Sequence, residues 1–124
     1  AAPHATAVKP NLAFFEAYGS AGVAALERIL AAVPPGVLVV ADAKRGDVEN
    51  TVARQAVALF DALGADAVTV NPYLGLGALE AFLERSDRYA YVLCRTSNPG
   101  AGELQDLVVA AEPDVGAPGV AELR

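Results

Sequence analysis

The sequence of 124 residues is 54% hydrophobic, so it can bury the core of one domain, and we interpret residues 1–124 as a single domain. Nine basic and fifteen acidic residues give a net charge of −6, which argues against non-specific binding to nucleic acid or to anionic membranes. No apolar run reaches the roughly 20 residues of a membrane span and no signal-type segment is evident, so the sequence predicts a cytoplasmic protein.

The first expected strand, residues 5–8, ends at Lys9, because Pro10 has no amide proton with which to continue a central ladder. A helical turn is expected at residues 11–18, and a longer helix at residues 19–33. The expected apolar face of the longer helix consists of Val23, Leu26, Ile29, Leu30 and Val33.

The second expected strand is residues 37–40, four apolar residues in succession, as in a strand that is buried on both faces. The charged residues that follow are expected just past its carboxyl end. A helix is expected at residues 50–63, ended by Gly64, with an apolar face of Val52, Ala56, Leu59, Phe60 and Leu63. The later expected elements are a strand, a loop, a helix, a strand and a polar loop at residues 65–70, 71–75, 76–83, 89–94 and 95–102.

Strands that alternate with helices predict an α/β fold with a parallel sheet and right-handed crossovers. Two closures are open at this point: a doubly wound sheet, or a (β/α)8 barrel, which needs roughly 200–250 residues. The chain supplies about four βα units, so it is expected to form a partial barrel in the second case. Residues 112–124, which are rich in Pro and Gly, are expected to form a loose tail.

Each expected strand ends in a polar cluster, and in a parallel sheet these clusters meet at one edge. The clusters are Lys9-Pro10-Asn11, residues 42–47, Asn71-Pro72-Tyr73 and Arg95-Thr96-Ser97-Asn98. Asp42, Lys44 and Asp47 form the pattern D-x-K-x-x-D, and the spacing of two places Asp42 and Lys44 on the same strand face. We expect Lys9 beside Asp42 and Lys44 beside Asp47, in a chain of alternating charges. The alternative interpretation is a structural salt-bridge network or solvated loop charges.

Other kinds of site have little support in the sequence. Neither G-x-x-x-x-G-K-[ST] nor G-x-G-x-x-G occurs, so these nucleotide-binding loops are not indicated. His4, the single histidine, is expected to be exposed, and Cys94, the single cysteine, is expected to be buried and inert. We therefore expect no metal and no cofactor, and the chemistry that remains is proton transfer and electrostatic stabilisation by Lys and Asp.

Four segments in the same order resemble orotidine 5′-phosphate decarboxylases of the bacterial branch with longer chains. They are VKPNLAFFEAYG, ADAKRGD, DAVTVNPYLG and RTSNPGAGELQDL, at residues 8–19, 41–47, 66–75 and 95–107. The resemblance extends over about residues 5–107. It implies a cofactor-free carboxy-lyase with a TIM-barrel fold that converts orotidine 5′-phosphate to UMP and CO2 in pyrimidine biosynthesis.

The resemblance also implies roles for individual residues. Lys9, Asp42, Lys44 and Asp47 match the charged tetrad of the family. Asp47 is then expected to act in the active site of the other subunit of a homodimer, accompanied by Thr51. Ser97 matches a serine that contacts the pyrimidine, and Asn11 is a further candidate for substrate binding.

The sequence also departs from the family pattern. The strand with a ribose-contacting Asp and the later phosphate-binding loop with its Arg are not found, so the chain is expected to be an inactive fragment with two unpaired sheet edges. One alternative is a Mg²⁺-dependent relative, a hexulose-phosphate synthase or ketogulonate-phosphate decarboxylase, in which an acidic ligand is expected at the position of Lys9. Another alternative is a non-catalytic fragment that only associates with other chains.

Overall fold

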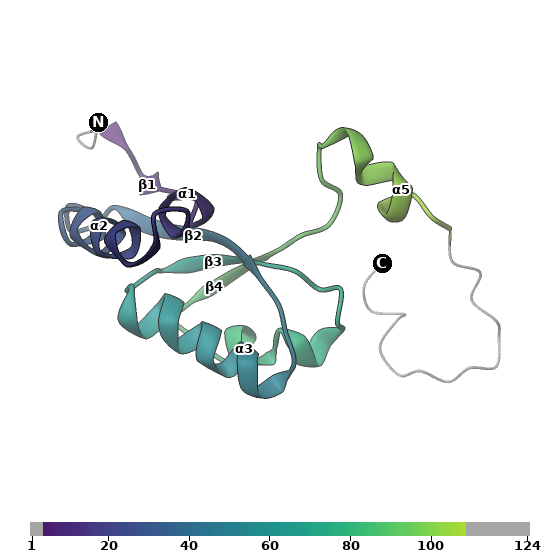
Figure 1. The fold of residues 1–124 in the computed structure, drawn as a ribbon. Helices are drawn as coiled ribbons and strands as arrows, with labels where there is room; N and C mark the ends of the chain where they lie inside the picture. Colours follow the sequence, from purple (N-terminus) through teal and green to yellow (C-terminus); the bar gives the residue numbers. More distant parts are fainter. Residues whose placement is uncertain (1–3, 109–124) are drawn as a thin grey trace. The chain divides into compact units, whose positions relative to one another are not determined.

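A computed structural model of the protein describes residues 4–108. These residues fall into two compact units that divide between Leu93 and Cys94. The first unit contains a four-stranded parallel sheet, seen in Figure 1, with the strands in the order β1-β2-β3-β4. The strands are β1 (Ala7–Val8), β2 (Leu38–Arg45), β3 (Ala67–Val70) and β4 (Tyr89–Val92). Because spatial order follows chain order without a reversal, the arrangement favours a barrel segment over a doubly wound sheet.

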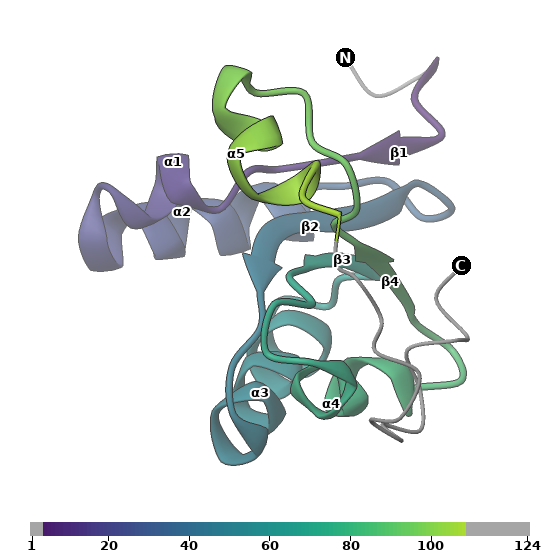
Figure 2. The same ribbon diagram turned by 90° about the vertical axis from the view of Figure 1, so that its right-hand side faces the viewer.

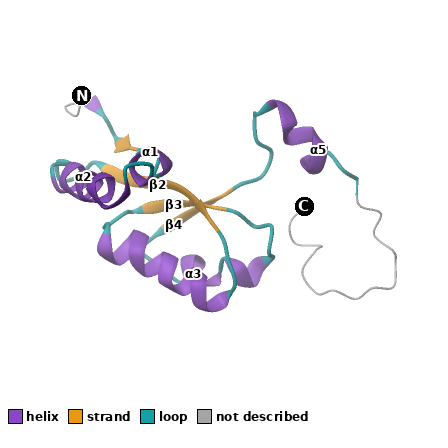
Figure 3. Cartoon of the chain, viewed as in Figure 1, coloured by secondary structure: helices purple, strands orange, loops and turns teal. Residues whose placement is uncertain are grey.

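Helices separate successive strands, as Figure 3 shows, so the predicted βα alternation is confirmed. The helical segments of the first unit are α1 (Ala13–Glu16), α2 (Gly19–Ala31), α3 (Glu49–Ala56), the π-helical turn η2 (Val57–Ala62), the 3-10 turn η3 (Leu76–Ala78) and α4 (Glu80–Leu83). Figures 1 and 2 both show α3 on one side of β3, and Figure 2 shows α4 next to α3. None of the helices in the described residues is both long enough and apolar enough to span a membrane.

The core lies between β3 and the helices α3, η2 and α4. The largest fully buried side chains are Phe60, Phe82, Val52, Val68 and Val70. The rings of Phe60 and Phe82 meet edge to face, with their centroids 6.1 Å apart. The predicted apolar face of residues 50–63 is confirmed, although Leu63 is only partly buried. Gly64 follows this helix with φ +68°, the left-handed conformation expected after a helix end.

The predicted apolar face of α2 is partly wrong. Val23 and Ile29 are exposed, Leu26 is buried, and Leu30 and Val33 are partly buried. The buried stripe begins at Gly22, where a Cβ atom would lie 1.8 Å from the backbone carbonyl oxygen of Phe15. The contact between α1 and α2 is therefore made at this glycine, and not at Val23 or Ile29, which are exposed. A hydrophobicity pattern gives no weight to glycine and therefore misplaces the face.

The second strand is also longer than predicted. Leu38, at its start, is half exposed, so the run is not buried on both faces throughout. The strand then continues through Arg45, which places Asp42 and Lys44 inside β2 rather than past its end. This extension is possible because both neighbouring segments keep hydrogen bonds to the charged part of β2.

Smaller differences concern the remaining elements. The helical turn at residues 11–18 shortens to α1, and the helix at residues 76–83 divides into η3 and α4. β4 ends at Val92, and Cys94 is exposed rather than buried, because the strand ladder does not extend to it. In the second unit, the 3-10 turn η4 (Pro99–Ala101) interrupts the predicted loop, and α5 (Gly102–Gln105) was not predicted. His4 is exposed as expected, and the predicted tail lies outside the described residues.

Candidate active site

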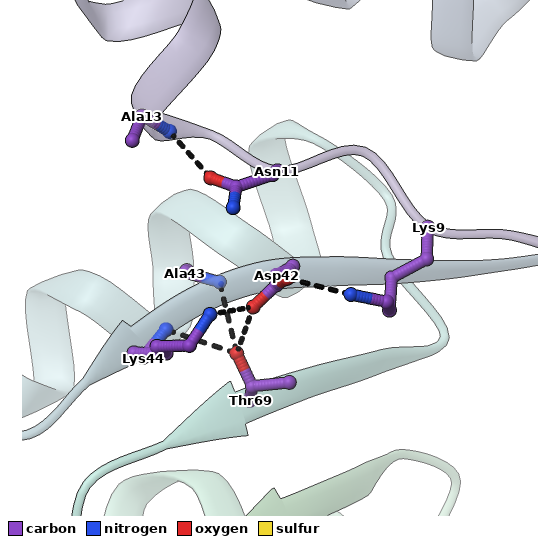
Figure 4. Close-up of polar contacts among 7 residues, drawn as sticks. All are labelled: Lys9, Asn11, Ala13, Asp42, Ala43, Lys44 and Thr69. Atoms are coloured by element: carbon purple, nitrogen blue, oxygen red, sulfur yellow. Dashed lines mark hydrogen bonds and ion pairs between the residues drawn. The ribbon is translucent and has the colours of Figure 1, made fainter. Parts of the chain in front are cut away.

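The centre of the candidate site is the carboxylate of Asp42, which is only 7% exposed. Lys44 donates a hydrogen bond from Nζ to Asp42 Oδ1 over 2.5 Å, and Lys9 donates from Nζ to Asp42 Oδ2 over 2.6 Å (Figure 4). The side chains of Lys9 and Lys44 are 58% and 49% exposed. A buried carboxylate therefore holds two ammonium groups at the protein surface, where they can meet a ligand. We call Lys9, Asp42 and Lys44 the charged triad.

The chain after β1 runs beside β2 and so brings Lys9 to Asp42. The amide of Asp42 donates to the carbonyl of Pro10 over 3.0 Å, and the amide of Leu12 donates to the carbonyl of Asp42 over 3.1 Å. Asn11 forms an isolated parallel bridge with Asp42 between these two bonds. Pro10 has no backbone amide proton to donate, so it fits a position where only its carbonyl forms a hydrogen bond.

On the other side, β2 forms an irregular pairing with β3. Ala41 pairs with Val68 and Arg45 pairs with Val70, so the charged segment lies within a bulge. Lys44 has φ +49°, which makes it the one non-glycine residue with positive φ among residues 4–108. Such a conformation is rarely adopted by a lysine, and residues with this strain are concentrated at functional sites.

Gly46 closes the bulge, because a Cβ atom there would lie 2.3 Å from the carbonyl oxygen of Asn71. The Asn71 amide donates to the Arg45 carbonyl over 2.7 Å, which fixes this close approach. Arg45 itself forms an ion pair with Glu16 at the end of α1. The bulge is therefore tied on one side to β3 and on the other to α1.

Hydrogen bonds from Lys44, then Lys9, lower the pKa of Asp42 from 3.8 to about 2, although burial acts in the opposite direction. The hydroxyl of Thr69 adds a third hydrogen bond that acts in the same sense. Asp42 is therefore ionised at neutral pH.

Asp47 is not joined to the charged triad. It is partly buried, and its Oδ1 accepts a hydrogen bond from the amide of Val48 over 2.7 Å. The expected contact between Lys44 and Asp47 is not found, since the described residues contain no ion pair that includes Asp47. Lys44 instead turns back to Asp42. Asp47 faces a shallow groove that it lines together with Glu49 and Leu74.

Three more predicted site residues are Thr51, Asn11 and Ser97, and neither Thr51 nor Asn11 forms a side-chain hydrogen bond with the charged triad in the described residues. Thr51 is exposed on α3. The backbone of Asn11 forms a bridge with that of Asp42, but the side-chain Oδ1 of Asn11 accepts a hydrogen bond from the amide of Ala13 over 3.1 Å (Figure 4). Ser97 is exposed and belongs to the second unit. The roles of all three residues stay predictions.

A second groove runs between the helices of the first unit, with Phe15, Leu26, Leu59 and Thr51 among its lining residues. Its walls are mostly apolar and include no member of the charged triad. We therefore place the candidate site at the triad and not in this groove.

The sequence interpretation missed Thr69, whose hydroxyl contacts both Asp42 and the bulge. Thr69 is a polar residue within the apolar run of β3, next to the strand with the charges. A hydroxyl in such a run needs a hydrogen-bond partner, and that requirement is the signal that could have identified it.

Comparisons with known proteins bear on the family and the fold of this chain. The sequence profile of the orotidine 5′-phosphate decarboxylase / HUMPS family matches residues 1–118. An orotidine 5′-phosphate decarboxylase from Thermomicrobium roseum is 57% identical over an alignment of 109 residues, and the match covers 86% of this chain and 39% of that protein. Among solved structures, Leishmania donovani OMP decarboxylase has a TM-score of 0.81 and 48% identity, with 83% of this chain and 41% of that chain covered. Leishmania donovani UMP synthase has a TM-score of 0.82 and 47% identity, and the match covers 84% of this chain and 23% of that chain.

The chain thus spans about two fifths of the length of the curated relatives that it matches. Its parallel sheet with consecutive strand order is a partial (β/α)8 barrel, as predicted. The match covers nearly all of the chain, including every segment that contributes to the charged triad. The chain belongs to the orotidine 5′-phosphate decarboxylase / HUMPS family.

Proposed function

We propose that this sequence carries the charged part of the active site of an orotidine 5′-phosphate decarboxylase, which converts orotidine 5′-phosphate to UMP and CO2 in the cytoplasm. The observation that carries the proposal is the pairing of one buried carboxylate, Asp42, with two half-exposed ammonium groups within 2.6 Å. The names of the relatives, which are about half identical to this chain, support the same activity.

The triad suits a reaction that removes a carboxylate and leaves a carbanion. Asp42 lies next to the carboxylate of the bound substrate and raises the free energy of the ground state, while Lys44 stabilises the charge that develops at C6. The bond between C6 and the carboxylate breaks, its electron pair stays on C6, and CO2 leaves. Lys44 then donates a proton from Nζ to C6 to give UMP, and the neutral amine takes up a proton from water. Lys9 holds Asp42 ionised and in position throughout.

The remaining predicted residues complete the site in this proposal. Ser97 contacts the pyrimidine, and Asn11 contacts the substrate next to Asp42. Asp47 and Thr51 act in the active site of the second subunit of a homodimer. This arrangement is supported by the position of Asp47. In the described residues, Lys44 pairs with Asp42 and not with Asp47, and Asp47 lines the groove that it shares with Glu49 and Leu74.

A chimera tests the activity. The matched 109-residue segment of the Thermomicrobium roseum decarboxylase is replaced by that of this chain, and release of CO2 from orotidine 5′-phosphate is measured. We expect turnover within about tenfold of the parent, which corresponds to about 1.4 kcal/mol in the barrier. Lys44→Ala should abolish turnover, while Arg28→Ala, at an exposed position on α2, should not change it. A folded chimera without activity, or full activity in the Lys44→Ala variant, would contradict the proposal.

Mixed dimers of the chimera test the shared site. Homodimers of Lys44→Ala chains and of Asp47→Ala chains are each expected to be inactive. In a mixed dimer both defects fall into one site, and the other site has an intact Lys44 and an intact Asp47, so subunit exchange should restore activity. If Asp47 serves its own chain, every site keeps one defect, and demonstrated exchange without recovered turnover would remove Asp47 from the shared site.

The nearest alternative is a Mg²⁺-dependent relative such as a hexulose-phosphate synthase, because the matched family is not restricted to orotidine 5′-phosphate decarboxylases. An acidic metal ligand is expected in them at the position of Lys9, whereas Lys9 in this chain pairs with Asp42. This ion pair occupies the carboxylate that a metal ion would need. The chimera distinguishes the two activities directly, since the two kinds of enzyme act on different phosphorylated substrates.

A further inference from the structure

Three residues of β2 face a single residue of β3 in the bulge. Ala41 pairs with Val68 and Arg45 pairs with Val70, so residues 42–44 stand opposite Thr69 alone. The ordinary ladder offers one backbone carbonyl for each backbone amide, and this mismatch leaves amides of the bulge without such a partner.

The hydroxyl of Thr69 takes the place of the missing carbonyl. Its Oγ1 accepts hydrogen bonds from the amide of Ala43 and from the amide of Lys44, each over 3.0 Å. It also donates its proton to Asp42 Oδ1 over 3.0 Å, as Figure 4 shows. A hydroxyl has one proton and two lone pairs, so all of its hydrogen-bonding capacity is used in the bulge.

These three bonds act on the two residues whose relative position matters for the charged triad. The bond to the Lys44 amide holds a backbone with φ +49°, which is unfavourable for a lysine without such support. The bond to Asp42 directs Oδ1, the same oxygen that accepts the hydrogen bond from Lys44 Nζ. One side chain of β3 therefore fixes both the backbone of Lys44 and the carboxylate that it pairs with.

We propose that Thr69 is a positioning residue that holds Asp42 and Lys44 in the geometry needed for proton transfer to the substrate, through its hydroxyl rather than through packing. The inference rests on the proposed decarboxylase function of the same site. Thr69 is not within the triad and donates to no substrate atom in this proposal.

Two pairs of variants separate the hydroxyl from the shape of the side chain. Thr69→Val keeps the branched shape and removes the hydroxyl, and Thr69→Ser keeps the hydroxyl. If Thr69→Val does not fold, Thr69→Ala and Thr69→Ser form a second pair, since both lack the methyl group and only Ser keeps the hydroxyl. All variants are made in the 124-residue chain and in the chimera.

The first measurement is amide hydrogen exchange, which does not depend on activity. Loss of the hydroxyl should speed exchange at Ala43 and Lys44 by at least about tenfold, the effect of losing one hydrogen bond. The amide of Tyr89, which donates to the carbonyl of Asp66 on the other side of β3, should keep its rate. Equal exchange at Ala43 and Lys44 with and without the hydroxyl would overturn the inference.

The second measurement is steady-state kinetics of the chimera. Loss of the hydroxyl should lower kcat by about 10- to 100-fold, the usual effect of a misplaced catalytic group, and change KM less, while Ser should restore most of kcat. If kcat of the Thr69→Ser variant falls as far as that of Thr69→Val, Thr69 acts only through packing. If kcat of the Thr69→Val variant is unchanged, Thr69 does not contribute to the reaction. If the chimera without substitutions is inactive, but loss of the hydroxyl still speeds exchange at Ala43 and Lys44, the proposed function is rejected and the structural role of Thr69 remains.

Discussion

Replacing Asp42 by Asn in the chimera should remove an acid-sensitive part of the stability. The pKa of Asp42 is lowered from 3.8 to about 2, mainly by hydrogen bonds from Lys44 and Lys9. Between these two pH values the folded state binds fewer protons than the unfolded state, so the free energy of unfolding falls as the pH falls. The contribution is fully present above about pH 4 and is lost below about pH 2.

The size of this contribution follows from the shift. The full difference corresponds to between about 2 and 3 kcal/mol, since one pKa unit is worth about 1.4 kcal/mol. Because Lys9 and Lys44 are 58% and 49% exposed, solvent screens part of the attraction, and we expect about 1–2 kcal/mol. The assay is urea unfolding, followed by circular dichroism, of the parent chimera and the Asp42→Asn variant from pH 6 to pH 2.

The parent chimera should lose its advantage over the Asp42→Asn variant as the pH falls through this window. Glu84→Gln is the control, because Glu84 is exposed and takes part in no ion pair of the described residues, so its removal should alter the acid profile little. A stability difference between the parent and Asp42→Asn that stays constant to within about 0.5 kcal/mol over the whole range would refute the reasoning, since that is the usual scatter for surface changes.

Three further predictions concern the bulge, the core and metal dependence. Gly46→Ala should destabilise the chimera by about 1–3 kcal/mol in urea unfolding, because the added Cβ atom meets the Asn71 carbonyl, while Gly77→Ala, which has open space around it, should cost less than about 1 kcal/mol. Phe82→Ala should cost about 3–5 kcal/mol through loss of a buried ring, whereas Tyr73→Ala, at an exposed position, should change stability by less than about 0.5 kcal/mol. Decarboxylation by the chimera should survive exhaustive treatment with EDTA, and loss of activity that Mg²⁺ restores would favour the metal-dependent relatives.

The elements that could be predicted from the sequence are those in which neighbouring side chains share one environment. The face of α3 and η2 is an example, since Val52, Ala56, Leu59 and Phe60 recur at helical spacing and all pack into one core. The parallel sheet follows in the same way from the alternation of strands and helices. The proximity of Lys9 and Asp42 could also be predicted, because each follows the apolar run of one of two neighbouring parallel strands.

What could not be predicted depends on contacts between distant backbones. The bulge of β2 arises from its pairing with β3, and the three hydrogen bonds of Thr69 join residues that are 25 to 27 positions apart. Lys44 was expected beside Asp47 in a chain of alternating charges, whereas Lys44, with its left-handed backbone, pairs with Asp42. Gly22 was missed for a related reason, since its importance lies in the backbone of α1 that packs against it.

The charge balance of the triad is compatible with the anionic substrate proposed above, although the whole protein is acidic. The whole sequence has a net charge of −6, yet two ammonium groups and one carboxylate leave one positive charge at the triad, and both ammonium groups reach the surface. A single chain thus attracts an anion locally, despite its overall charge. If Asp47 of a second subunit joins the site, as proposed, the four charges cancel, and the substrate carboxylate then meets Asp42 and Asp47 without net attraction. In the proposed dimer, Asp47 therefore adds to the electrostatic stress that Asp42 already places on the ground state.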